Sequence, residues 1–260
     1  MFRLTRQVRF ALGDAGAVPA RGGNGFAGVP PLVGFGIFLM LDVTLEGELE
    51  PASGYLRNIK DIDDAVRRIV LPHLSIAARD HAPPARSIGE VFGLLQDAWP
   101  PARLARLSLH LSPFLGFTVD ASELPMTRIH QRFEFSASHR LHNPALSDSD
   151  NRRCFGKCNN PHGHGHNYEL QVTLRGQPDS NGLLIDIPRF EQIVAEAVID
   201  KFDHKNLNQE LAEFRDVNPS VENIARVIFR LLRPRFTGGA GELASVTVWE
   251  TPKTWCEYAE

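Results

Sequence analysis

The chain has 260 residues, of which 43% are hydrophobic and 23% charged, and its formal net charge is −3. This composition is that of a globular protein with a folded core, and the absence of a basic block or of arginine interleaved with aromatic residues predicts no nucleic-acid partner. The apolar runs are far too short to span a bilayer, and the N-terminus lacks the apolar core of a signal peptide, so we expect a cytoplasmic protein with no membrane association.

The spacing of apolar residues predicts six elements in the first half of the chain. Alternation of apolar and polar residues indicates strands, and apolar residues at i, i+3 and i+4 indicate helices. A loop rich in glycine and proline is expected over 13–31. In chain order we predict strands at 2–12 and 34–49, helices at 61–71 and 87–99, and strands at 104–111 and 114–119.

The second half repeats this order of elements. A long polar loop is expected over 141–161, between the first two strands. We predict strands at 126–139 and 164–174, helices at 188–201 and 219–232, and strands at 243–250 and 255–260.

The repeated order indicates an internal duplication. Residues 34–47 align with residues 163–176 without a gap, and shorter matches follow in the helices and late strands. The sequence therefore predicts an α+β protein of two tandem ββααββ domains, 1–120 and 121–260, each with two helices on one face of an antiparallel sheet.

Three histidines predict a metal site in the second half. His164 and His166 are two residues apart in a predicted strand, so their side chains point to the same face, and His139 ends the strand before. Three histidines that leave one position open are typical of a catalytic zinc site. An alternative is a structural zinc site formed by Cys154, Cys158, His164 and His166. The chain's three cysteines fit a reducing compartment, where cysteine is a ligand or a nucleophile.

Five sequence blocks carry a family resemblance. FSASHRL, CFGKCNNPHGHGHNY, FDHKNLN, PSVENIA and VWETP resemble, in order and spacing, the signature blocks of the 6-pyruvoyl-tetrahydropterin synthase and 6-carboxytetrahydropterin synthase family. The resemblance covers about residues 126–260 and implies the tunnelling fold (T-fold) of that family.

The resemblance assigns a role to each candidate residue. The zinc ligands are expected at His139, His164 and His166. Cys158 falls on the catalytic cysteine and Glu250 on the carboxylate that anchors the pterin. Asp203 and His204 fall on an acid/base pair that a neighbouring subunit supplies in this family. A bound zinc ion would lower the pKa of the cysteine, and an aspartate would orient the histidine.

The resemblance also implies a substrate, 7,8-dihydroneopterin triphosphate, with Zn²⁺ as cofactor. Two products stay open. The five residues between Cys158 and His164 resemble the spacing of enzymes that eliminate triphosphate to give 6-pyruvoyl-tetrahydropterin. The Ala/Arg/Pro-rich composition favours 6-carboxytetrahydropterin, on the queuosine route. A metal-binding or assembly module without turnover is the alternative function.

The first copy is expected to be a non-catalytic scaffold. Asp14, Phe35 and Ile37 align with the three predicted histidine ligands, and Phe and Ile cannot bind zinc. We therefore expect a homo-oligomer, most simply a trimer of two-domain chains, that uses the first copy for its sheet edges and interfaces.

Overall fold

The computed structural model describes residues 1–12, 24–32 and 34–260. The predicted alignment partner Asp14 and most of the predicted loop over 13–31 lie outside these residues. The described chain divides into two compact units, which differ in bounds from the predicted 1–120 and 121–260. Unit 1 comprises Met1–Ile129 and Arg175–Leu184, and unit 2 comprises His130–Leu174 and Ile185–Glu260.

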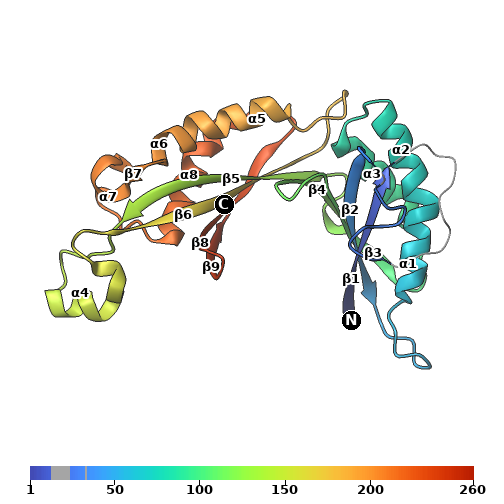
Figure 1. Ribbon diagram of the computed structural model, residues 1–260, viewed down its shortest axis with the longest axis horizontal. Helices are drawn as coiled ribbons and strands as arrows, with labels where there is room; N and C mark the ends of the chain where they lie inside the picture. Colours follow the sequence, from blue (N-terminus) through green and yellow to red (C-terminus); the bar gives the residue numbers. More distant parts are fainter. Residues whose placement is uncertain (13–23, 33) are drawn as a thin grey trace. The chain divides into compact units, whose positions relative to one another are not determined.

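Figure 1 shows strands covered by helices in both units, as expected for an α+β protein. The strands are β1 (Phe2–Leu12), β2 (Ile37–Gly47), β3 (Arg103–His110), β4 (Leu115–Asp120), β5 (Thr127–His139), β6 (His164–Gly176), β7 (Lys205–Asn206), β8 (Glu242–Thr251) and β9 (Thr254–Tyr258). The α-helices are α1 (Ile59–Ala65), α2 (Leu71–Arg79), α3 (Pro84–Leu95), α4 (Asp148–Phe155), α5 (Ile187–Val194), α6 (Asp200–Phe202), α7 (Leu207–Glu210) and α8 (Val221–Leu232). The π-helical segments are η1 (Val66–Val70) and η4 (Ala195–Ile199). The 3₁₀ helices are η2 (Ala121–Glu123), η3 (Gly156–Asn159), η5 (Ala212–Phe214) and η6 (Arg233–Arg235).

Unit 1 is built on strands β1 to β4, which pair in chain order and antiparallel. In β2 every second residue is buried, including Leu41 and Val43. Helices α1, α2 and α3 cover one face of this sheet (Figure 1). The partly buried pair of Arg6 in β1 and Asp63 in α1, 2.8 Å apart, identifies that face.

Unit 2 has the strand order β5-β6-β8-β9, and β7 pairs with the end of β5 in the parallel direction. Its core lies between this sheet and helices α5 and α8 (Figure 1). The face of the sheet toward the helices presents Phe135, Tyr168 and Leu170, which are all buried. Odd residues of β5 and even residues of β6 therefore face the helices.

The largest differences from the predicted elements are in two segments. The helix predicted at 61–71 continues to Arg79, because the π-helical turn η1 directly precedes Pro72 and widens the backbone where a proline cannot donate a hydrogen bond. The predicted loop 141–161 contains helix α4, which has no apolar stripe. Its N-terminus is capped instead by the Ser147 side chain, which accepts a hydrogen bond from the backbone N–H of Asp150.

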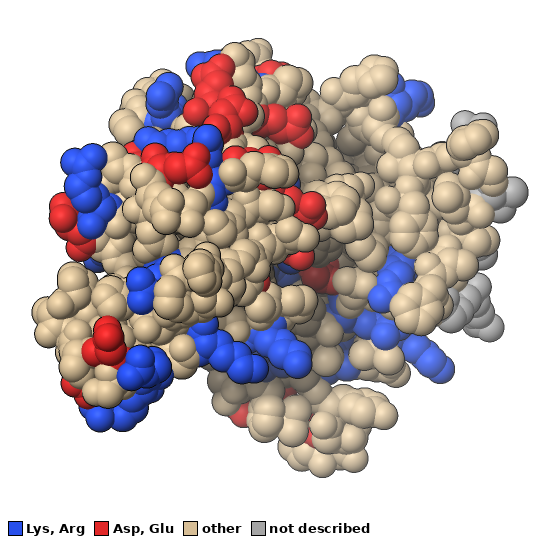
Figure 2. Space-filling model, turned by 60° about the vertical axis from the view of Figure 1, so that its left-hand side comes forward, with Lys and Arg blue, Asp and Glu red and all other residues tan. Residues whose placement is uncertain are grey.

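The surface carries both signs of charge. On the face shown in Figure 2, basic and acidic residues are interspersed, and many of them form ion pairs, such as Arg128 with Glu123 and Arg106 with Asp120. Among the described residues, no helix has both the length and the hydrophobicity needed to cross a membrane.

Candidate active site

Strands β5 and β6 bring the three predicted histidines together. His139 is the last residue of β5, and His164 and His166 are the first and third residues of the neighbouring β6. Gly163 permits this approach: its φ is +72°, and a Cβ there would lie 2.9 Å from the carbonyl oxygen of His139. A glycine is therefore required immediately before the first histidine of the pair.

The side chains of His139, His164, His166 and Glu250 form one cluster, in which the four candidate ligand atoms lie within 4.8 Å of one another. The Nε2 atoms of His139 and His164 are 3.1 Å apart. Glu250 Oε1 lies 3.3 Å from Nε2 of His139 and 3.5 Å from Nε2 of His166. The family resemblance predicts that Glu250 anchors the pterin. In the structure its carboxylate lies next to the predicted metal ligands His139 and His166.

A hydrogen bond to the backbone orients the ring of His139 toward the cluster. Its ring is fully buried, and Nδ1 lies 2.6 Å from the carbonyl oxygen of Pro219, which accepts only. Nδ1 therefore donates this hydrogen bond, and Nε2 faces Nε2 of His164 and the Glu250 carboxylate. Three imidazoles with a nearby carboxylate suit a divalent transition metal such as zinc.

His164 and His166 are also available as metal ligands. Burial lowers the pKa of His164 and of His166, so both stay neutral at neutral pH. Nε2 of His166 has no hydrogen-bond partner in the described chain. The carboxyl group of Glu250 has a lowered pKa, mainly through its hydrogen bond with His139, and is ionised. The residues present thus fit a bound metal ion.

Cys158 lies in η3, on the loop between β5 and β6. Its carbonyl oxygen accepts a hydrogen bond from the backbone N–H of Leu141 at 2.8 Å, and the side chain of neighbouring Asn159 donates to the Leu141 carbonyl at 2.7 Å. Burial raises the pKa of the Cys158 thiol, and the negative charge of Glu250 raises it further. The thiol therefore lies in the electrostatic environment of the cluster.

The alternative structural site does not match this grouping. The cluster contains neither cysteine of the proposed set, Cys154 or Cys158, and includes His139 instead. Cys154 is exposed, on helix α4.

Asp203 and His204 form a hydrogen-bonded pair on the opposite face of the sheet. Nδ1 of His204 lies 2.7 Å from Asp203 Oδ2, and Asp203 Oδ1 accepts a hydrogen bond from the backbone N–H of Ser136. The Ser136 bond, followed by the His204 bond, lowers the pKa of Asp203. His204 has φ +57° and an 84% exposed side chain. It borders an open hollow of about 570 Å³ that Ser136 and Asn167 also line.

The strand positions show on which face of the sheet the side chains that border this hollow lie. Side chains alternate between the two faces of a strand. Ser136 is an even residue of β5, which carries His139, and Asn167 is an odd residue of β6, which carries His164 and His166, so both face the other side of the sheet. The structure therefore brings the three histidines and Glu250 together, and the side chain of His204 is exposed.

Tyr168 is a residue of the site that sequence reasoning missed. Its ring packs 5.5 Å from that of His166 and 6.2 Å from that of His139. The available signal was its position two residues after His166 in an alternating strand, which places it on the same face.

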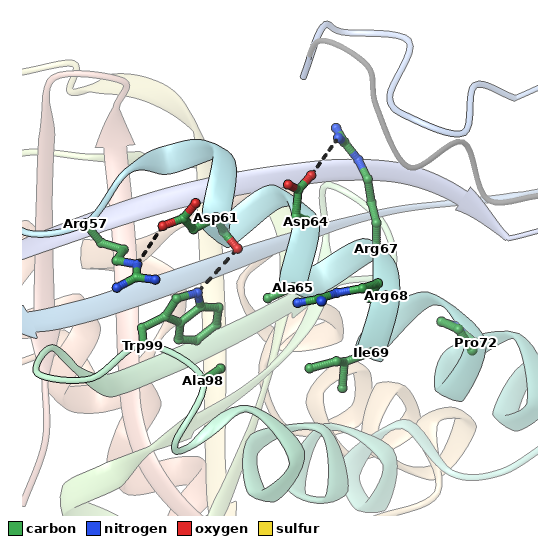
Figure 3. Close-up of a pocket in the computed structure, with 10 residues that line it drawn as sticks. All are labelled: Arg57, Asp61, Asp64, Ala65, Arg67, Arg68, Ile69, Pro72, Ala98 and Trp99. Atoms are coloured by element: carbon green, nitrogen blue, oxygen red, sulfur yellow. Dashed lines mark hydrogen bonds and ion pairs between the residues drawn. The ribbon is translucent and has the colours of Figure 1, made fainter.

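Unit 1 has a larger hollow, of about 700 Å³, but with different chemistry (Figure 3). It is lined by arginines and aspartates that pair with each other, such as Arg57 with Asp61 at 2.9 Å. No histidine or cysteine lines it. Phe35 and Ile37, the residues aligned with two of the histidines, are exposed, and among the described residues the metal-binding grouping lies in unit 2 alone.

Comparisons with known proteins identify the family of the second half of the chain. Residues 128–260 match the family described as 6-pyruvoyl tetrahydropterin synthase. The chain belongs to this family.

The relatives include both 6-pyruvoyl and 6-carboxy synthases. The human 6-pyruvoyl tetrahydrobiopterin synthase is 41% identical over 125 residues, covering 48% of this chain and 85% of the human protein. The 6-carboxy-5,6,7,8-tetrahydropterin synthase of Haemophilus influenzae is 29% identical over 156 residues, covering 52% of this chain and 100% of that protein. The structure of Caenorhabditis elegans 6-pyruvoyl tetrahydropterin synthase matches with a TM-score of 0.50 and 36% identity, over 52% of this chain and 96% of that one.

Proposed function

We propose that this protein is a zinc-dependent lyase that converts 7,8-dihydroneopterin triphosphate into a 6-substituted tetrahydropterin. The observation that carries the proposal is the convergence of His139, His164 and His166 on one point beside Glu250, in a chain of the pterin synthase family. The charge of Glu250 acts on the thiol of Cys158. A metal-binding module without turnover would not need the thiol in this position or the outward-facing pair of Asp203 and His204.

The three histidines would hold the ion. Bound there, zinc supplies Lewis acidity toward the hydroxyl groups of the substrate's side chain. Burial and Glu250 raise the pKa of Cys158, so a neighbouring positive charge is what would make this thiol a base near neutral pH. Cys158 would then take a proton from the substrate's side chain.

Glu250 and the pair of Asp203 and His204 complete the site. The lowered pKa of Glu250 keeps it ionised, as needed to accept two parallel hydrogen bonds from the amino and ring N–H groups of a pterin. His204, oriented by Asp203, would return or relay a proton. Because His204 faces away from the cluster of its own chain, we propose that it serves the site of a neighbouring subunit.

This arrangement requires a homo-oligomer. Within the described residues, β1 pairs only with β2 and β9 only with β8, so each unit has an open sheet edge. A closed trimer of about 87 kDa, from the 28.9 kDa chain, would pair such edges, with unit 1 serving as scaffold. The three cysteines are free, which fits a reducing cytoplasmic compartment.

Between the two products, we favour elimination of triphosphate to give 6-pyruvoyl-tetrahydropterin. The five residues between Cys158 and His164 and the higher identity to the human synthase than to the 6-carboxy enzyme support it. The test is mass spectrometry of the products formed from 7,8-dihydroneopterin triphosphate by the zinc-loaded full chain. No conversion under these conditions would refute the lyase function, and the 6-carboxy product would refute the choice of product alone.

Metal dependence has a separate test. The double variant His164→Ala, His166→Ala should lose bound zinc, and the control His162→Ala, an exposed histidine outside the cluster, should keep one zinc per chain by metal analysis. Undiminished zinc in the double variant, or two ions per chain in the unmodified protein, would contradict the proposed site.

A further inference from the structure

The hydroxyl group of Tyr168 has no hydrogen-bond partner, although the side chain is fully buried. None of the residues that the structure describes forms a hydrogen bond with this hydroxyl. The ring is held firmly on both sides: it stacks on Phe135 at 5.0 Å and 17°, and contacts His166 at 5.5 Å. The hydroxyl is therefore fixed in position and cannot rotate out to water.

An unpaired buried hydroxyl needs an explanation. Leaving such a group without a partner costs about 1–3 kcal/mol. Phenylalanine would fill the same space among these rings without that cost. The hydroxyl is therefore a disadvantage for folding alone, which points to a partner that arrives with a ligand.

The surroundings of the hydroxyl identify the kind of ligand. The tyrosine packs against two of the three imidazoles, His139 and His166. The ring therefore packs directly beside the cluster of histidines and Glu250, where the proposed function places the reacting part of the substrate.

We propose that Tyr168 is a substrate-binding residue, whose O–H donates a hydrogen bond to an oxygen of the substrate's hydroxylated side chain. The proposal rests on the proposed function. It selects the side chain and not the pterin ring, because the tyrosine contacts His139 and His166, where the side-chain hydroxyls would bind. The hydrogen bond positions the side chain, and no proton is transferred.

The test compares two pterins that do not react. Neopterin carries the trihydroxypropyl side chain, and 6-methylpterin lacks its hydroxyl groups. In the zinc-loaded protein, Tyr168→Phe should weaken neopterin binding about 10- to 100-fold, as expected for a lost hydrogen bond in a buried site. It should leave 6-methylpterin binding unchanged, with an equal zinc content and a melting temperature that is not lowered. Fluorescence titration measures both affinities.

Tyr258→Phe is the matched control, because that hydroxyl bonds Glu260 at 2.8 Å outside the cluster, and it should change neither affinity. Equal affinities of Tyr168→Phe and the unmodified protein for neopterin would overturn the inference and leave an ordered water as the hydroxyl's partner. Equal weakening for both pterins would overturn it as well, since it indicates a structural role. The lyase function is tested separately, by turnover of 7,8-dihydroneopterin triphosphate in the unmodified protein.

Discussion

Asn151 holds the loop that carries Cys158, and its replacement tests how far that loop depends on one side chain. Asn151 is fully buried; its amide nitrogen lies 2.9, 3.1 and 3.2 Å from the carbonyl oxygens of Asn143, Leu146 and Ser147, and its oxygen accepts from the backbone N–H of Asn143 at 2.8 Å. An amide has two N–H groups, so these contacts amount to about three full hydrogen bonds. At about 1 kcal/mol each, Asn151→Ala should make loop opening easier by about 3 kcal/mol, or about 100-fold in the open population.

The assay is alkylation of Cys158 by a large thiol reagent, with the modified residue quantified by mass spectrometry. Cys154 is exposed and provides an internal reference that should react at the same rate in every variant. Cys158 should react up to about 100-fold faster in Asn151→Ala, since the open loop is the reactive form. The control Arg152→Ala removes an exposed side chain from the same helix. If both variants alkylate Cys158 at the same rate, the loop does not depend on the buried amide and the reasoning fails.

Three further predictions concern catalysis and assembly. Cys158→Ala should keep its zinc and its melting temperature but lose about 10²- to 10⁴-fold in kcat; loss of activity in Cys154→Ala instead would reverse the assigned roles. Glu250→Gln should raise KM for the pterin substrate while zinc content stays the same, whereas loss of zinc in metal analysis would make Glu250 a ligand and not the pterin anchor. Light scattering should give a trimer of about 87 kDa from the 28.9 kDa chain, and a chain truncated to begin at Ala121 should not assemble. A monomeric full-length protein, or a truncated protein that is soluble and fully active, would remove the scaffold role of the first half.

The alternation of side chains in strands determined much of the site. A strand places residues i and i+2 on one face whatever surrounds it, so the spacing of His164 and His166 sufficed to predict that both point the same way. The addition of His139 required only that the two predicted strands be neighbours, and they are. The same alternation predicted most strand positions.

Tertiary structure decided what local spacing does not encode. Glu250 reaches the histidines because β8 lies beside β6, and Pro219, before α8, supplies the carbonyl that fixes the tautomer of His139. Helix α4 escaped prediction because hydrogen bonds of buried Asn151 stabilise it in place of an apolar stripe. His204 faces away from the cluster because the chain crosses to β7 at the end of β5. Each of these depends on contacts between residues far apart in the chain, which arise only when the sheet and helices pack.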